Sequence, residues 1–160
     1  MPTISQTANA LKTFIATAEK VWFTVYDSAD DRFIVTDEDG TEYKRLPLVF
    51  STKAKVIAYF RRYWGINMSN IMFCNLKSIS RNNRLYVIVG DTGTVPFIPR
   101  RIKVTGRSST RIRVTAVLSI DENTDEDIQR VRYLISTSGN KLIILNRDKK
   151  NTDPRYSKCP

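Results

Sequence analysis

Histidine is absent from this chain, and cysteine occurs only twice in its 160 residues. Histidine is the usual acid–base group near neutral pH and the commonest metal ligand in proteins. A nucleophile activated by an imidazole is therefore excluded, and so is the usual imidazole-containing zinc site. Carboxylate, lysine or tyrosine chemistry stays open, but the composition favours a protein that binds. We expect no catalytic residue, no metal and no cofactor.

The chain also lacks a long apolar run. Its longest apolar runs, at 85–89 and 142–145, have the length of a strand, whereas a membrane-spanning helix needs roughly 18 apolar residues or more. The first residues, Met1–Gln6, show neither the basic start nor the apolar stretch of a signal peptide. A leader that had been removed would leave the same picture, so the compartment stays open at this stage.

The two cysteines fit no spacing known for metal or redox motifs. Cys74 follows Phe73 in an apolar segment, which predicts a buried structural thiol. The alternative is a disulfide with Cys159 that ties down the C-terminal tail.

Size and composition predict one folded domain over residues 1–160. Hydrophobic residues make up 41% of the chain and aromatic residues 10%, which argues against disorder. The net charge is +10, and it is unevenly placed. Residues 1–65 hold 9 Lys and Arg against 8 Asp and Glu, whereas residues 66–160 hold 17 against 8. The basic second part indicates an anionic partner, or simply a solvated basic surface.

Hydrophobic spacing predicts helices in the first half of the chain. Apolar residues recur at helical intervals over 7–26, with Lys12 and Glu19 assigned to the solvated face. A second helix over 53–63 begins after a cap at Ser51 or Thr52, and Ser69 is expected to cap a third, short helix to residue 76. Between the first two helices, Asp37–Gly40 is the turn of a small hairpin over 32–46.

From residue 80 the periodicity changes to that of strands. The predicted strands are 84–89, 100–105, 110–120, 129–137 and 141–147. This order predicts an α+β fold, in which two or three N-terminal helices and the hairpin (7–80) pack on a curved antiparallel sheet (81–147). Residues 148–160 are expected to form a loose tail.

Alternation in the predicted sheet places basic side chains on one face. In the strand at 110–120, Ile112 and Val114 share one face while Arg111 and Arg113 share the other. If the strands are neighbours, one basic face results, made of Arg101, Lys103, Arg111, Arg113, Arg130 and Arg132. It is either a solvated surface or a docking surface for an acidic partner. Threonine, serine and valine lie between the cations instead of stacking aromatics, which argues against nucleic acid.

The acidic clusters of the chain all lie in predicted turns. The segment Asp121–Asp127 lacks the spacing and the glycine of a calcium loop. The triplet Asp91-Thr92-Gly93 matches that of aspartic peptidases but has no symmetric mate in the chain. We interpret these carboxylates as solvated, with Asp121–Asp127 available to offset the basic face.

The loop 90–99 is long for a hairpin connection and carries two glycines and two prolines. Long loops are often functional. It exposes Val95, Phe97 and Ile98 unless these residues fold back on the core. We therefore predict a partner-binding loop, made of Gly90, Asp91, Thr92, Gly93, Thr94 and Phe97.

Four segments, in this order, resemble the IseA family of bacterial inhibitors of cell-wall DL-endopeptidases. They are the helix end Val21–Tyr26, the hairpin strand Thr41–Pro47, the helix Ser51–Phe60, and Asn83–Tyr86 followed by Asp91-Thr92-Gly93. The resemblance covers residues 8–147 and rests on the order of the segments. Asn83-Arg84 departs from the Asn-Gly-Lys of the family, and Asp91-Thr92-Gly93 has one glycine where the family's Asp-Gly-Gly has two.

The resemblance implies a cystatin-like or NTF2-like fold and a secreted protein of the Gram-positive cell envelope. Its partner would be an NlpC-type wall endopeptidase, which it would plug without chemistry of its own, with Gly90–Thr94 as the inserted element. An alternative is a domain of a larger envelope protein that binds an anionic polymer or a ligand through the basic face. A teichoic acid of the wall would suit such a face. An NTF2-like enzyme would need a polar group inside the fold, where the inward positions are almost all apolar.

Overall fold

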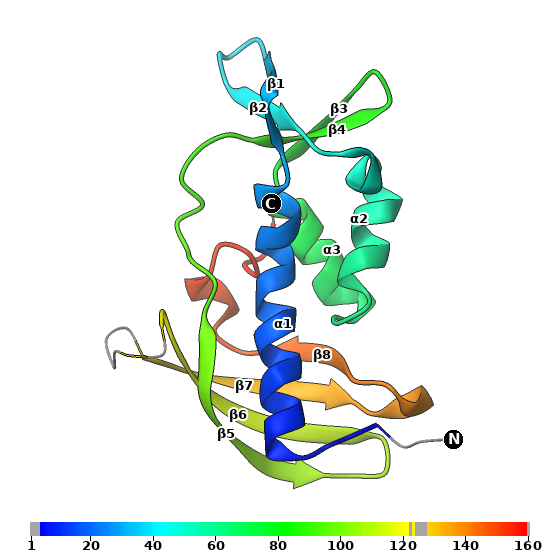
Figure 1. Cartoon of the computed structure of the whole chain (residues 1–160), viewed down its shortest axis with the longest axis vertical. Coiled ribbons are helices and arrows are strands. Elements are labelled where there is room, and N and C mark those ends of the chain that lie inside the picture. The colour runs from blue at the N-terminus through cyan, green and yellow to red at the C-terminus, as the bar shows by residue number, and fades with distance from the viewer. Residues whose placement is uncertain (1–3, 122, 124–127, 160) are drawn as a thin grey trace.

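The computed structural model describes residues 4–121, 123 and 128–159. The α-helices are α1 (Ala8–Asp27), α2 (Lys53–Phe60) and α3 (Ile66–Cys74), and single 3-10 turns lie at Leu48–Phe50, Ser138–Asn140 and Lys150–Thr152. The strands are β1 (Asp30–Thr36), β2 (Glu42–Arg45), β3 (Ser78–Arg81), β4 (Arg84–Ile88), β5 (Ile98–Arg107), β6 (Arg111–Ser119), β7 (Gln129–Ser136) and β8 (Ile143–Arg147). The predicted α+β arrangement is confirmed (Figure 1).

Threonine hydroxyls cap the first two helices. The Thr7 hydroxyl accepts a hydrogen bond from the Ala10 amide at 3.2 Å, and Thr52, one of the two expected caps, does the same for Lys55. The third helix starts four residues earlier than predicted, after Gly65. Ser69 does not cap it, because this side chain is buried and its hydroxyl donates to the Trp64 carbonyl at 3.3 Å.

The strands form two four-stranded antiparallel sheets, in the orders β1-β2-β4-β3 and β5-β6-β7-β8. The prediction that the strand at 84–89 belongs to the C-terminal sheet is wrong, because β4 pairs with β2 and β3. Strand β3 was not predicted. Asn82 and Asn83 have φ values of 52° and 61°, so they form the two-residue left-handed turn that folds β3 onto β4.

The pairing of β4 determines which elements the loop after it connects. Residues 89–97 connect the two sheets and are not the end of a hairpin. In Figure 1 the β1–β4 sheet lies at one end of the molecule and the β5–β8 sheet at the other, with α1 running between them and this connection beside it.

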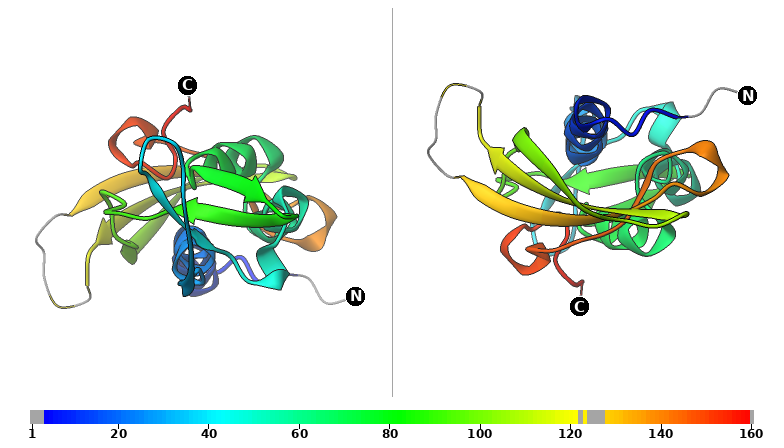
Figure 2. Two further views of the ribbon diagram at one scale, coloured as in Figure 1. Left: turned by 90° about the horizontal axis from the view of Figure 1, so that it is seen from above. Right: turned by 90° about the horizontal axis from the view of Figure 1, so that it is seen from below.

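Helix α1 packs on one face of the β5–β8 sheet, as Figures 1 and 2 both show. Leu11 and Ile15 of α1 are fully buried, and Ile112 and Val114 of β6 are 1% exposed. The same core takes in Trp64, residues of α2 and α3, and Leu85 and Val87 of β4. The assignment of the whole chain to one domain stays a prediction, which this connected core supports. Among the described residues, no helix is long and apolar enough to span a bilayer.

Candidate functional site

The predicted partner-binding loop has a defined backbone conformation. Gly90 and Gly93 have φ values of 146° and 72°, which other residues rarely adopt. Between them, the Asp91 carboxylate accepts a hydrogen bond from the Gly93 amide at 2.8 Å, and the Thr92 hydroxyl donates to the Thr94 carbonyl at 2.8 Å. Gly90, Asp91 and Gly93 are exposed. The loop therefore presents a folded tip to solvent.

Helix α1 supports the start of this loop through Tyr26. The Tyr26 hydroxyl lies 2.8 Å from the Ile88 carbonyl oxygen and 3.1 Å from that of Gly90. Burial raises the pKa of Tyr26, so the hydroxyl keeps its proton and remains a donor at neutral pH. The Tyr26 ring stacks on Trp22 with centroids 5.1 Å apart, which fixes the side chain from the opposite side.

The C-terminal segment (residues 148–159) supports the loop from a second direction. The prediction of a loose tail is wrong, because Asp153, Arg155 and Tyr156 are at most 1% exposed. The Tyr156 ring packs on Trp64 at 5.1 Å between centroids. The Cγ atom of Pro154 would lie 3.5 Å from a Cβ placed on Gly93, so the segment lies beside the loop tip.

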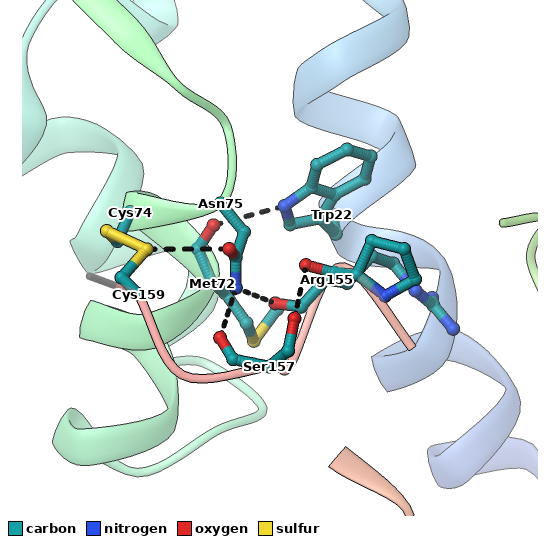
Figure 3. Close-up of a disulfide and its surroundings, with 8 residues drawn as sticks. Trp22, Met72, Cys74, Asn75, Arg155, Ser157 and Cys159 are labelled. Carbon is teal, nitrogen blue, oxygen red and sulfur yellow. Dashed lines mark hydrogen bonds between the residues drawn. A yellow bond between two sulfur atoms is a disulfide. The ribbon is translucent and has the colours of Figure 1, made fainter. Parts of the chain in front are cut away.

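A disulfide between Cys74 and Cys159 closes the C-terminal segment onto α3. The expectation of a buried free thiol is wrong, and the alternative of a disulfide is confirmed. Figure 3 shows how Asn75, next to Cys74, adds to this closure. Its amide donates to the carbonyls of Arg155 and Ser157 at 3.0 and 2.8 Å. Nearby, the Trp22 indole donates to the Met72 carbonyl at 3.1 Å.

An open hollow of about 650 Å³ lies beside the loop. It is lined by Asp91, Gly93, Thr94, Val95, Phe97, Ile120, Ile128, Gln129 and Thr152. Val95, Ile120 and Ile128 are each about 41% exposed, and they give the hollow an apolar side next to the polar loop tip. Phe97 is partly buried against the core, whereas Val95 remains at the surface.

A buried ionic cluster, which the sequence analysis missed, lies under the C-terminal segment. The Glu19 carboxylate of α1 is 2.9 Å from the Arg147 guanidinium and 3.1 Å from that of Arg155. It also accepts hydrogen bonds from the hydroxyls of Tyr133 and Tyr156, at 2.5 and 2.7 Å. The assignment of Glu19 to the solvated helix face is wrong, because its exposure is 0%.

The electrostatics of this cluster favour a structural role. Burial by itself raises the pKa of Glu19, but Arg147 and Arg155, helped by the two tyrosine hydroxyls, lower it below the ordinary value. A carboxylate that is held ionised, fully paired and closed to solvent is a poor proton shuttle. Helical spacing was the signal that could have predicted the burial of Glu19, because position 19 lies four residues after the buried Ile15.

The structure places all six predicted residues of the basic face in exposed positions of β5, β6 and β7. They point away from α1, since Ile112, Val114 and Tyr133 fill the opposite face. Of the acidic loop 121–127, only Asp121 and Asn123 lie within the described residues. The described residues contain no group of three Cys, Asp or Glu side chains that could hold a metal ion.

Comparison with known proteins places the chain in a family. Residues 2–138 match the IseA DL-endopeptidase inhibitor family, and the chain belongs to it. No curated protein matches the chain. Strand β8 and the C-terminal segment, which carry Arg147, Arg155 and Cys159, lie beyond the matched range.

Proposed function

We propose that the protein binds and inhibits a cell-wall DL-endopeptidase without chemistry of its own. Membership of the IseA DL-endopeptidase inhibitor family carries this proposal. The absence of histidine from the sequence supports a non-catalytic role. The buried carboxylate of Glu19 supports it too, since its two oxygens are occupied by arginine and tyrosine partners. An inhibitor of wall hydrolysis would act outside the cytoplasm, which makes secretion part of the proposal.

The loop Gly90–Thr94 is the proposed inserted element. It has an internally hydrogen-bonded tip and is supported from α1 by Tyr26 and from the C-terminal segment by Pro154. A loop that is ordered before binding loses less conformational entropy on binding than a mobile one. Val95, Ile120 and Ile128 supply apolar contact area at its side. A polar tip with an apolar flank suits insertion into the cleft of an enzyme.

Titration into a purified NlpC-type DL-endopeptidase that digests peptidoglycan tests the proposal. We expect digestion to fall to a low plateau near one equivalent of inhibitor, and the complex to co-elute in gel filtration. A variant in which residues 91–94 are replaced by Gly-Ser-Gly-Ser is expected to keep the fold, checked by circular dichroism, and to lose inhibition. Unchanged digestion in stoichiometric excess of the intact protein contradicts the proposal.

A further inference from the structure

The outer face of β5, β6 and β7 carries positive charge that the described residues leave uncompensated. Arg132 is paired, with its Nε atom 2.9 Å from the Asp148 carboxylate. The side chains of the other five cations of the basic face have no ion pair or hydrogen bond with any residue in 4–121, 123 or 128–159; they are Arg101, Lys103, Arg111, Arg113 and Arg130. This face is therefore open to an anionic ligand.

The register of the strands spreads these charges into an array. Arg101 lies opposite Val117, which lies opposite Arg130, and in the next row Lys103 is followed by Thr115 and then by Arg132. The backbone positions of the two cations in one row are thus about 9–10 Å apart, because neighbouring strands are about 4.8 Å apart. Like charges directly opposite one another would cost stability. Neutral residues on β6 avoid this cost within each row, whereas the expected offset by the acidic loop falls on residues that lie mostly outside the described part of the chain.

A hollow of about 300 Å³ lies within this face. Arg113 and Arg132 line it, together with the polar side chains of Thr105 and Asn146 and the carboxylate of Asp148. Asp148 also accepts a hydrogen bond from the Arg132 amide at 2.7 Å, which holds Arg132 at the edge of the hollow. One phosphate group could be seated beside Arg113, while its neighbours along a polymer reach Lys103, Arg101 and Arg130.

The neutral residues of the face indicate which kind of polyanion it can bind. Side chains between and beside the cations are Thr105, Thr115, Val117, Leu134 and Ser136. None of them is aromatic, so a nucleic acid would find no stacking partner there. A single small anion would contact at most one or two of the cations. Charge complementarity over three strands therefore favours a linear polymer of phosphodiesters with aliphatic repeat units.

We propose that this face binds a polyol-phosphate polymer of the cell envelope and holds the inhibitor near its enzyme. The choice of an envelope polymer rests on the proposed function, whereas the binding of a polyphosphodiester rests on the sheet alone. The basic face and the loop Gly90–Thr94 are made of different residues, so one molecule can use both. The polymer would raise the local concentration of the inhibitor where wall hydrolysis takes place.

Binding of the intact protein to poly(glycerol phosphate), measured by calorimetry across a range of salt concentrations, tests the proposal. The variant Lys103→Glu/Arg113→Glu should bind about tenfold more weakly or worse, with a shallower salt dependence. The matched control Arg61→Glu/Arg81→Glu changes the net charge equally, from +10 to +6, at exposed positions outside the basic face. It should keep most of the affinity.

The outcomes separate this proposal from the inhibitor function. The Lys103→Glu/Arg113→Glu variant should still inhibit a DL-endopeptidase acting on soluble wall fragments, and its circular dichroism should match that of the parent protein. If charge reversal disturbs the fold, Lys103→Gln/Arg113→Gln gives the same test with a smaller change. Equal loss in both double variants, no binding of the parent protein, or tighter binding of oligo(dT) than of poly(glycerol phosphate) would overturn the proposal.

Discussion

Cys74 at the end of α3 and Cys159 near the C-terminus are joined by a disulfide across 85 residues of sequence. The segment that it closes carries Pro154, which lies beside the tip of the proposed partner-binding loop, and Arg155 and Tyr156, which bind Glu19. The disulfide therefore holds in place both the residue that supports the loop and the residues that cover the ionic cluster. If the loop is the inserted element of the proposed inhibitor, stability and inhibition are linked through this one segment.

Removal of the disulfide should destabilise the protein measurably. Closing so long a loop restricts the unfolded chain, and we expect Cys74→Ser/Cys159→Ser to lower the free energy of unfolding by about 2–4 kcal/mol. Urea titration followed by tryptophan fluorescence measures this change. Dithiothreitol should lower the midpoint of the parent protein and leave that of the variant where it is. Equal midpoints for the parent protein and the variant would contradict the role of the disulfide.

Loss of Glu19 should be more damaging than loss of a surface ion pair. In Glu19→Gln, Arg147 keeps its buried charge without a carboxylate, and breaking a buried pair in this way costs about 3–5 kcal/mol. The matched control is Asp31→Asn, which breaks the Lys44–Asp31 pair at a position where the Asp31 side chain is 80% exposed. Differential scanning calorimetry should show a much lower Tm for Glu19→Gln and little change for the control. Similar Tm shifts in both would refute the structural role of the cluster.

The same cluster predicts how stability depends on pH. The pKa of Glu19 is lower in the folded protein than its ordinary value of 4.5, so the unfolded chain binds more protons in that range. Stability is then present above pH 4.5 and is lost as the pH falls through the folded pKa. Burial raises the pKa values of Tyr133 and Tyr156 well above 10, so the unfolded chain loses protons first above pH 10 and stability falls there too.

Urea midpoints measured between pH 2 and pH 11 check both limbs of this profile. Tyr156→Phe should flatten the alkaline limb, because one of the two buried phenols is gone. The acid limb should keep its direction in that variant, since Glu19 still has Arg147 and Arg155. A midpoint that stays constant from pH 7 to pH 11 in the parent protein would contradict the assignment of the buried tyrosines.

Local periodicity was enough to predict α1 and the inner face of β6, because each has a regular apolar stripe. It was not enough for Glu19. The position of this residue matches the buried stripe of the helix, but its charge indicated a solvent-exposed side chain. The partners that make its burial tolerable, Arg147 and Arg155, lie 128 and 136 residues away. The residues next to Glu19 in the sequence do not show whether its buried charge is paired, because its partners come from distant parts of the chain.

The pairing of strands was also beyond the sequence pattern. Leu85, Tyr86 and Val87 are all buried, which indicates a central strand but does not say in which sheet. The pairing of β4 with β2, which lies about 40 residues earlier in the chain, determines the sheet to which β4 belongs. The length and glycines of the loop 90–99 predicted a partner-binding loop, which stays a proposal. The residues that support the loop were not predicted, because Tyr26 and Pro154 reach it only in the folded molecule.

The conformation of Gly93 offers a direct test of the loop. A Cβ on Gly93 would meet Pro154 at an ordinary contact distance of 3.5 Å, so Gly93→Ala acts through backbone strain at φ 72° and not through a clash. A left-handed alanine costs about 1–2 kcal/mol, which the loop can relieve by changing shape. If the loop inserts into the endopeptidase, the inhibition constant should rise several-fold, up to about tenfold.

Gly40 in the β1–β2 turn provides the matched control for this test, with φ 83° and open space around it. Gly40→Ala carries a similar strain at the far sheet and should leave the inhibition constant unchanged. Gly93→Asn should recover much of the inhibition, because asparagine tolerates the left-handed region better than alanine does. An equal loss of inhibition in Gly93→Ala and Gly40→Ala would mean that general destabilisation, and not the shape of the loop, controls inhibition.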